Sequence, residues 1–532
     1  MILRLVLTIV MVLATAGRAR AQAGSLSPLF GTEGRTVTSV PPTINNRLFA
    51  MAAAPDGTMI AVGSGDEMEA GGASSALVVA RVSIDGQMIA STGLHLVPGD
   101  WVSSQDVAKG VAIQPDGRIV IAADTCTINF CGERDLAVIR LLPSLARDAS
   151  FGDGAWGSGV SIVTVRDPNW GVTGIAVQPD GRIVVAGTSG LLRLTHDGHP
   201  DPSFGTSGRV APVFPAFEEI SALALTPRAR IIVAGATYDT ASAMVSLAQY
   251  RSDGSLDTAF GAEGRATVPG IVGRALAVAI QPDGRIVVAG EIHTGATRQL
   301  GLWRFNADGS LESGFGDGGS ATIGGLGMLT AATAVAIQTD DRIVIAGQTM
   351  RQGADGGESN DFLVARFLAD GTPDISFGRA GAATTDLLGY QDIAEVVVIQ
   401  PSGTIVLGGW SLDADFEARF AFAAYLGWPP NEAPVIVSLT ASPNLLWPPN
   451  HKMVNVTVEY GVIDDFDASP ECHLSVPDDT SSDWEIVDAH HVRLRAARAD
   501  RGRARIYAIR TTCQDTGGRE TQQQVLVRVE RK

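Results

Sequence analysis

Short apolar runs separated by turn residues recur along most of the chain, and this pattern predicts β-strands. In the clearest copy, Ala277–Gly290, an alternating apolar run reaches a Pro-Asp-Gly turn and a β-branched run follows it. Proline presets φ and glycine accepts a positive φ, so the copy predicts two antiparallel strands joined by a tight turn. A third strand at Leu302–Phe305, a second turn at Asp308–Leu311 and a short strand near 319–323 complete a unit of four strands.

The sequence pattern of the four-strand unit occurs seven times along the chain. Its copies are centred on the turn residues Pro55, Pro115, Pro179, Pro227, Pro282, Thr339 and Pro401. Four short strands cannot bury both faces of a sheet alone, so the units must stack, and a ring of blades does this while protecting the sheet edges. The pattern therefore predicts an all-β fold in which residues 22–428 form a seven-bladed β-propeller.

The two ends of the repeat region complement each other. Repeat seven stops after its third strand, Phe420–Leu426, whereas Ser25–Arg35 near the N-terminus resembles Ser255–Arg265 of a complete repeat. We predict that Arg35–Val40 pairs with Phe420–Leu426, so that an N-terminal strand closes the propeller. Repeat one lacks Phe-Gly around 92–101, and repeat four has Pro-Arg-Ala-Arg in place of its first turn, so both are expected to have altered turns.

A proline-rich segment ends the repeats. Residues 429–433 are predicted to be a linker, because proline and a change of pattern are typical of a domain boundary. Residues 434–532 carry short alternating runs, which predict strands at Val435–Leu439, Met453–Tyr460, Val492–Ala496, Ala504–Arg510 and Gln523–Val529. Such strands over about 100 residues are typical of a small β-sandwich.

Two resemblances to known families follow from these motifs. The run Gln-Pro-Asp-Gly-Arg-Ile-Val-Val-Ala-Gly, followed by Asp-Gly-Ser-Leu-Asp and Phe-Gly, resembles the delta-60 repeat of secreted bacterial proteins, which is a β-propeller repeat. Segments 442–453 and 513–519 resemble bacterial immunoglobulin-like modules of the HYR type. The first resemblance implies a fold and leaves the activity open. The second implies an immunoglobulin-like spacer or adhesive unit in which Cys472 and Cys513 form a staple.

The first 21 residues are predicted to be a secretion signal. Arg4 precedes an apolar core of 12 residues, and Ala19-Arg20-Ala21 supplies a small-x-small cleavage site. That core is too short to cross a bilayer, which needs about 20 residues. We therefore expect cleavage after Ala21, no transmembrane segment afterwards, and a secreted, periplasmic or cell-surface location.

Cysteine usage and net charge agree with a location outside the cytoplasm. Four cysteines suit an oxidising compartment, and pairing Cys126 with Cys131 and Cys472 with Cys513 is the simplest of three connectivities. The formal net charge is −17, and a strongly acidic surface repels phosphate backbones. We therefore do not expect nucleic acid as a partner. The expected partner is a protein or carbohydrate ligand outside the cytoplasm.

The loops between second and third strands vary most, and strand alternation places them all on one face of the ring. Variable loops on a rigid scaffold are the usual place for recognition. The candidate ligand-binding residues on this face are Asp66, Glu67, Phe130, Tyr238, Asp355, Glu358, Trp410, Asp413 and Asp415. Their carboxylates and aromatic rings suit a cation, a basic peptide or a saccharide, and they equally suit a solvated surface without a ligand.

A calcium site is the one cofactor that the sequence suggests. Asp464, Asp465, Asp467 and Glu471 offer hard oxygen ligands at one end of the predicted sandwich, although they lack the glycine and the spacing of an EF-hand loop. A solvated turn is the alternative. The repeated aspartates of the Pro-Asp-Gly turns are interpreted as backbone-bonding turn residues rather than ligands.

Three functions remain open at this stage. The leading hypothesis is an exported, non-catalytic binding or adhesion protein that presents its propeller loop face. The alternatives are a secreted hydrolase or lyase with a site in the propeller funnel, and a structural envelope component. No nucleophile elbow, zinc-protease helix or phosphate loop is found in the sequence. Carboxylates and histidines gathered at the funnel would favour an enzyme, whereas alanine, valine and glycine there would favour binding.

Overall fold

The structure is a computed structural model. It describes residues 22–69, 72–96, 106–125, 134–154, 158–167, 169–211, 218–238, 242–295, 297–324, 330–352, 358–427, 434–463, 470–477, 482–497, 504–514 and 519–530. The chain divides into two units, Met1–Trp428 and Pro429–Lys532, which are described separately below. Among the described residues, no helix is long and apolar enough to span a membrane.

In the first unit, the described strands form seven four-stranded antiparallel sheets. Sheet 1 consists of β2 (Ile44–Ala53), β3 (Met59–Glu69), β4 (Gly72–Val82) and β5 (Met88–Leu94). Sheet 2 consists of β6 (Val107–Ile113), β7 (Ile119–Thr125), β8 (Arg134–Leu141) and β9 (Val160–Asp167). Sheet 3 consists of β10 (Val172–Val177), β11 (Ile183–Gly187), β12 (Gly190–Leu194) and β13 (Arg209–Val210). Sheets 4 and 5 consist of β14 (Glu218–Leu225), β15 (Ile231–Tyr238), β16 (Ala243–Tyr250) and β17 (Arg265–Thr267); and β18 (Gly273–Ile280), β19 (Ile286–Thr294), β20 (Thr297–Phe305) and β21 (Ser320–Ala321). Sheets 6 and 7 consist of β22 (Thr330–Ile337), β23 (Ile343–Gln352), β24 (Glu358–Phe367) and β25 (Ala382–Thr385); and β26 (Asp392–Ile399), β27 (Ile405–Leu412), β28 (Ala418–Tyr425) and β1 (Arg35–Thr38).

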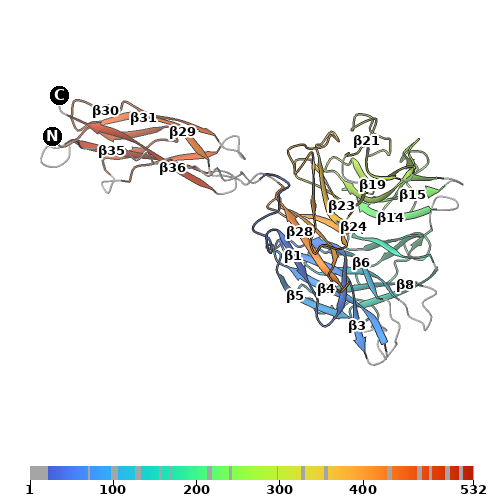
Figure 1. Ribbon diagram of the computed structural model, residues 1–532. Helices are drawn as coiled ribbons and strands as arrows, with labels where there is room; N and C mark the ends of the chain where they lie inside the picture. Colours follow the sequence, from blue (N-terminus) through green and yellow to red (C-terminus); the bar gives the residue numbers. More distant parts are fainter. Residues whose placement is uncertain are drawn as a thin grey trace, which may run out of the picture. The chain divides into compact units, whose positions relative to one another are not determined.

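The sheets form a closed ring. Each first strand contacts the first strand of the next sheet, from β2 through β6, β10, β14, β18, β22 and β26 back to β2. Closure uses the N-terminal strand, as predicted: β1 pairs with β28, with Arg35 opposite Ala423 and Thr38 opposite Phe420. Figure 1 shows the blue β1 beside the orange β28. The arrangement is an all-β propeller.

A phenylalanine and a glycine join most sheets to the next. The Phe side chains are at most 1% exposed: Phe30, Phe151, Phe204, Phe260, Phe315 and Phe377. The amide of the glycine that follows each of them donates to a carbonyl oxygen of the next sheet at 2.6 to 3.1 Å, for example from Gly261 N to Asp308 O. The Phe-Gly motif is therefore a latch between sheets. Repeat one lacks it, as the sequence indicates, and β5 instead pairs along most of its length with β4.

An arginine on the third strand completes four of these latches. The arginines are Arg140, Arg193, Arg304 and Arg366. Arg193 is typical, because its Nε donates to Asp201 Oδ2 at 2.9 Å, its Nη1 donates to the Ser252 carbonyl of the next sheet, and its guanidinium lies 4.6 Å from the Phe204 ring centroid. Arginine forms such planar, forked contacts better than any other side chain. Specific polar contacts as well as apolar packing therefore hold neighbouring sheets together.

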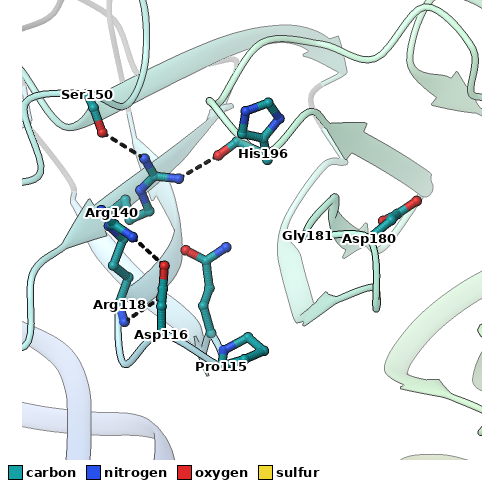
Figure 2. Close-up of a pocket in the computed structure, with 9 residues that line it drawn as sticks. Pro115, Asp116, Arg118, Arg140, Ser150, Asp180, Gly181 and His196 are labelled. Atoms are coloured by element: carbon teal, nitrogen blue, oxygen red, sulfur yellow. Dashed lines mark hydrogen bonds and ion pairs between the residues drawn. The ribbon is translucent and has the colours of Figure 1, made fainter.

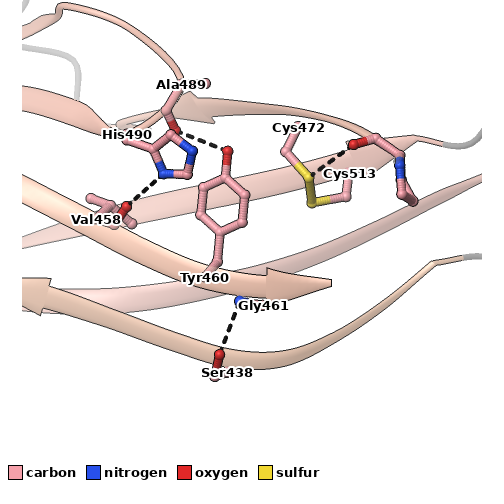
Figure 3. Close-up of a disulfide and its surroundings, with 9 residues drawn as sticks. Ser438, Val458, Tyr460, Gly461, Cys472, Ala489, His490 and Cys513 are labelled. Carbon is pink, nitrogen blue, oxygen red and sulfur yellow. Dashed lines mark hydrogen bonds between the residues drawn. A yellow bond between two sulfur atoms is a disulfide. The ribbon is translucent and has the colours of Figure 1, made fainter. Parts of the chain in front are cut away.

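The second unit is a sandwich of two four-stranded sheets, as the sequence predicts. One sheet holds β29 (Val435–Ser442), β31 (Met453–Ile463), β34 (His491–Arg495) and β33 (Trp484–Ile486); the other holds β30 (Leu445–Leu446), β36 (Glu520–Val529), β35 (Arg505–Gln514) and β32 (Glu471–Ser475). Residues of both sheets share one core that includes Val458, Leu494, Tyr507 and Val527. Figure 3 shows the Cys472–Cys513 disulfide, which joins neighbouring strands of the second sheet.

The disulfide confirms one of the two predicted pairings. Cys472 and Cys513 lie directly opposite each other on β32 and β35, with their Cα atoms 4.1 Å apart. Cys126 and Cys131 lie outside the described residues, so their pairing stays a prediction. Nearby, the His490 ring stacks on Tyr460 with centroids 4.5 Å apart, and the Tyr460 hydroxyl donates to the Ala489 carbonyl (Figure 3).

Candidate functional site

Every first strand of the ring has a β-bulge at the same place. At this place the register with the second strand skips one residue in each sheet, and in sheet 1 it also shifts once more, between Ile44 and Arg47. The skipped residues, which we call the bulge ring, are Phe49, Lys109, Thr173, Ser221, Leu276, Thr333 and Glu395. All of them are half-buried. Bulges re-aim side chains, and here they do so on the innermost strands, near the face that carries the loops between second and third strands.

The bulge ring is chemically uneven. Sheets 7, 1 and 2 contribute an acid, an aromatic ring and a base, whereas the other sheets contribute hydroxyl groups and a leucine. The Lys109 ammonium lies 3.4 Å from the Phe49 ring centroid, which is a cation–π contact. Burial raises the pKa of the Glu395 carboxyl, and the charge of Lys109 opposes this shift. Three neighbouring innermost strands therefore carry a base stacked on an aromatic ring and an acid that feels the charge of that base.

Trp410 is the predicted ligand residue that belongs to this group. Its indole Nε1 lies 3.4 Å from Glu395 Oε1 and donates to it, and the Arg47 guanidinium lies 4.9 Å from the centroid of its ring. We call Arg47, Phe49, Lys109, Glu395 and Trp410 the axial cluster. It can offer a ligand two cations, one carboxylate and two aromatic surfaces.

Tyr238 lies on the opposite side of the ring, at the seam of sheets 4 and 5. Its hydroxyl donates to Glu219 Oε2 at 3.0 Å. Across the seam, Arg274 Nε donates to Glu291 Oε1 at 2.6 Å, and His293 Nε2 lies 3.1 Å from the same oxygen. Burial, and then the hydrogen bond to Glu219, raise the pKa of Tyr238. These groups satisfy one another, so they fasten the seam.

Three carboxylates meet at the seam of sheets 6 and 7. One oxygen each of Asp361, Asp386 and Asp392 lies within 4.8 Å of the others, which is close enough to hold a metal ion. Asp392 accepts hydrogen bonds from Ser411 Oγ and from Leu387 N. Burial raises the pKa of Asp392 to about 6, and the charges of Asp386 and Asp361 add to the rise. Either a proton or a cation would relieve this repulsion.

The other predicted loop-face residues are dispersed. Asp66 accepts from Asn45 Nδ2 at 2.8 Å, and Glu67 Oε2 lies 2.9 Å from His95 Nε2. Asp413 binds Arg419 and Asp415 is exposed, both in the turn between β27 and β28. Glu358 begins β24, and its side chain lies outside the described residues, as do Phe130, Asp355, Asp464, Asp465 and Asp467; Glu471 is exposed on β32. The calcium site therefore stays a prediction.

One pocket lies on the other face, among the Pro-Asp-Gly turns of sheets 2 and 3. Figure 2 shows Arg140 reaching towards the His196 carbonyl and the Ser150 hydroxyl, with Arg118 on Asp116. Asp148 Oδ2 accepts from Arg140 Nε at 2.8 Å and pairs with Arg118 Nε at 2.9 Å. Arg140 belongs to the latch between the two sheets, and Asp116 and Asp180 form ion pairs within their own turns, so we interpret this pocket as a structural seam.

Sequence reasoning missed Arg47, Phe49, Lys109 and Glu395, although a signal for three of them exists. Every bulge-ring residue stands six positions before the central residue of its repeat, as Lys109 stands before Pro115. Around that column the repeats keep small and apolar residues, whereas the column itself runs through Phe, Lys, Thr, Ser, Leu, Thr and Glu. A variable column inside a regular strand marks positions that the fold does not dictate.

Five segments of the chain match the family described as a domain of unknown function (DUF5122) beta-propeller. The matched residues are 114–151, 178–204, 230–260, 281–315 and 338–377. Each segment begins at the first turn of a sheet and ends on its latch phenylalanine. No curated protein matches the sequence.

Several solved structures resemble the chain at low sequence identity. They include a catalytically inactive virginiamycin B lyase from Staphylococcus aureus with quinupristin (9% identity, TM-score 0.43, covering 73% of this chain and 98% of that one). Polysaccharide lyase Uly1 has 11% identity and a TM-score of 0.41, covering 75% and 92%. Sqt1 from Chaetomium thermophilum has 11% identity and a TM-score of 0.39, covering 76% and 98%. These values carry no argument about activity. The five matched units and the closed ring of four-stranded sheets identify the chain as a β-propeller protein.

Proposed function

We propose that this is an exported, non-catalytic binding protein whose propeller receives its ligand at the axial cluster. One observation carries the proposal: the bulge ring places Lys109, Phe49 and Glu395 together on one side of the axis, whereas the remaining positions are hydroxyl or aliphatic. A half-buried charge pair costs desolvation free energy that packing residues would not. Contacts of a ligand with both charges would offset this desolvation cost, so ligand binding accounts for the arrangement.

Binding accounts for the axial cluster better than catalysis does. Among the described residues, the bulge ring carries one carboxylate and one ammonium group beside hydroxyl, aromatic and aliphatic side chains. The Glu395 carboxylate accepts a hydrogen bond from the Trp410 indole, and the Lys109 charge favours its ionised form, which is an arrangement that orients a polar ligand. We infer a protein or carbohydrate ligand met outside the cytoplasm.

Export is part of the proposal. Cleavage after Ala21 would leave Gln22 first, and the Gln22 amide already donates to the Ser376 carbonyl at 3.1 Å. The closing segment of the ring would therefore remain whole. We further assign the repeats to the delta-60 type and the sandwich to an HYR-like, immunoglobulin-type spacer, on the motifs described above.

The test screens the mature chain, residues 22–532, against glycans and envelope extracts with and without a chelator. Lys109→Met with Glu395→Gln removes both charges and keeps the side-chain lengths. We expect this double variant to lose binding, because it removes the two charged contacts together. Thr173→Val, at the same ring position in sheet 3, is the matched control and should bind normally. Unchanged binding by the double variant would move the ligand elsewhere, and turnover of any component would establish an enzyme instead.

A further inference from the structure

The turn between β27 and β28 exposes an aromatic side chain in a costly conformation. Phe416 has a φ of +61° and is 70% exposed. The turn around it is pinned, because Asp413 Oδ1 accepts from the amides of Asp415 and Glu417, both at 3.0 Å. Arg419 Nε donates to the other Asp413 oxygen at 2.7 Å. The position of Phe416 is therefore set by its neighbours.

The fold does not explain a phenylalanine at this position. Bulky residues are disfavoured at positive φ, where glycine fits without strain. Leu145 also has a positive φ of +67°, but it is 7% exposed and packs in the core, which compensates for the strain. Phe416 has no comparable burial. An exposed ring that is kept against backbone preference points to a use outside the folded chain.

Two further apolar groups complete the surface. Tyr390 meets Phe416 edge to face, with centroids 5.6 Å apart and planes at 64°. Leu388, from the same connection between β25 and β26, is 37% exposed. We call Leu388, Tyr390 and Phe416 the aromatic corner. It lies on the loop face, because both segments leave the sheet at the end where β26 begins.

Carboxylates flank the aromatic corner along both segments. Asp415 and Glu417 are the sequence neighbours of Phe416, and Asp386 belongs to the same connection as Tyr390. Arg419 is held by Asp413 and lies 3.7 Å from Glu417. A ligand at the corner therefore meets ring faces and hydrogen-bond acceptors, and an anionic ligand meets repulsion.

We propose that the aromatic corner binds a saccharide that lacks acidic groups. The C–H face of a sugar ring stacks on an aromatic face, while its hydroxyl groups donate to carboxylates. The corner is three side chains wide, whereas a stable protein interface needs roughly 20 to 30 residues a side, so a sugar unit fits it better than a protein partner. This inference goes beyond the axial cluster, whose residues belong to other segments and which has two cations at its core.

The experiment measures binding of the mature chain to an array of neutral, amino and acidic glycans, followed by titration of the best soluble oligosaccharide. We expect neutral or amino glycans to bind and acidic glycans to fail. Phe416→Gly should weaken binding by about tenfold or more, since it removes one aromatic contact. It should unfold at the same or a higher temperature than wild type, because glycine suits the φ of this position. Tyr390→Ala should also weaken binding.

One control makes the outcome specific. Ile375→Ala removes an apolar side chain that is 80% exposed on the opposite face and should leave binding unchanged. The proposal is overturned if no glycan without acidic groups binds, if acidic glycans bind better, or if Phe416→Gly binds as wild type does.

Discussion

The aspartates of the Pro-Asp-Gly turns bond to their own backbone. Asp56 Oδ1 accepts from Thr58 N at 3.0 Å, and Asp116, Asp180 and Asp283 each accept from the amide two residues on at 3.0 Å. Hydrogen bonds from the side chain and then the amide of Thr58 lower the pKa of Asp56. This confirms the turn interpretation of these aspartates. Asp392 differs from these turn aspartates, because its pKa moves the other way.

Asp392→Asn should remove a pH dependence of stability. The pKa of Asp392 rises from 3.8 to about 6 in the folded chain, so the stabilisation from its protonated form is present below pH 4 and is lost as the pH rises through 6. The shift corresponds to about 3 kcal/mol. Asparagine can accept from Leu387 N and donate to Ser411 Oγ. The free energy of unfolding of the variant, minus that of wild type, should therefore be larger at pH 7.5 than at pH 4.5.

Urea unfolding at both pH values, with a chelator present, measures this difference. Asp56→Asn is the matched control. The pKa of Asp56 is lowered from its ordinary value of 3.8, so Asp56 is ionised at both pH values and its variant should differ from wild type equally at the two. Equal differences between wild type and Asp392→Asn at the two pH values would contradict the prediction.

At the scale of the elements, an arginine on the third strand of a sheet fastens that sheet to the next one. Arg193→Gln removes the pair with Asp201, in which both side chains are 5% exposed, and the bond to the Ser252 carbonyl. We expect a loss of about 3 to 5 kcal/mol in the free energy of unfolding, because a buried partner is left behind. Arg182, 2.9 Å from Asp201, keeps the loss at the lower end of that range.

Sheet 4 supplies a natural comparison for this latch. It has Gln249 at the arginine position, and Arg230 pairs with Asp257 at 2.8 Å instead. Arg193→Gln with Asp201→Asn should recover part of the stability that the single variant loses, because the second change removes the buried carboxylate that the first one leaves behind. If Arg193→Gln unfolds as wild type does in urea, the latch contributes nothing and the prediction is wrong.

The second unit depends on its own cross-link. Cys472→Ser with Cys513→Ser removes a disulfide that spans 41 residues of sequence. We expect its unfolding transition to lose about 2 to 4 kcal/mol, since the open chain gains conformational entropy. The transition of the propeller should not move. Differential scanning calorimetry of wild type and the double variant resolves this, and a shift of the propeller transition would show that the units are coupled.

Strands and turns were largely predictable because their signals are local. Pro-Asp-Gly, alternating apolar runs and Phe-Gly each specify nearby backbone. One expectation was wrong: repeat four keeps the ordinary turn despite its Pro-Arg-Ala-Arg run, since Ala229 adopts a φ of +57° and the usual bonds to Thr226 form. The bulges were not predicted, because a bulge depends on the register between two strands rather than on either one.

At the scale of the whole molecule, ring closure was predictable and the candidate site was not. An incomplete last repeat and a matching N-terminal segment predict closure by themselves, and β1 confirms it. Phe49, Lys109 and Glu395 lie on three sheets, and nothing local in the sequence says that Lys109 stacks on Phe49 and that its charge acts on Glu395. Which residue faces the axis follows only from the shared bulge. The same limit applies to Tyr390 and Phe416.

Closure of the ring predicts that the seam between sheets 7 and 1 is as stable as the other seams. Phe30 is 1% exposed and packs in a core shared by sheets 7 and 1, just as Phe260 packs in a core shared by sheets 4 and 5. If the ring closes in solution, Phe30→Ala should cost the propeller about 3 to 5 kcal/mol, as Phe260→Ala should, because each leaves a cavity between two sheets.

Leu29 provides the control for this seam. It neighbours Phe30 and is 84% exposed, so Leu29→Ala should change the free energy of unfolding little. Urea unfolding of the three variants compares the closing seam with an interior seam of the same design. A costly Phe260→Ala beside a nearly neutral Phe30→Ala would mean that the N-terminal segment detaches in solution. The first strands would then lose the continuous ring that brings Glu395 to Lys109, and the axial cluster would lose its geometry as well.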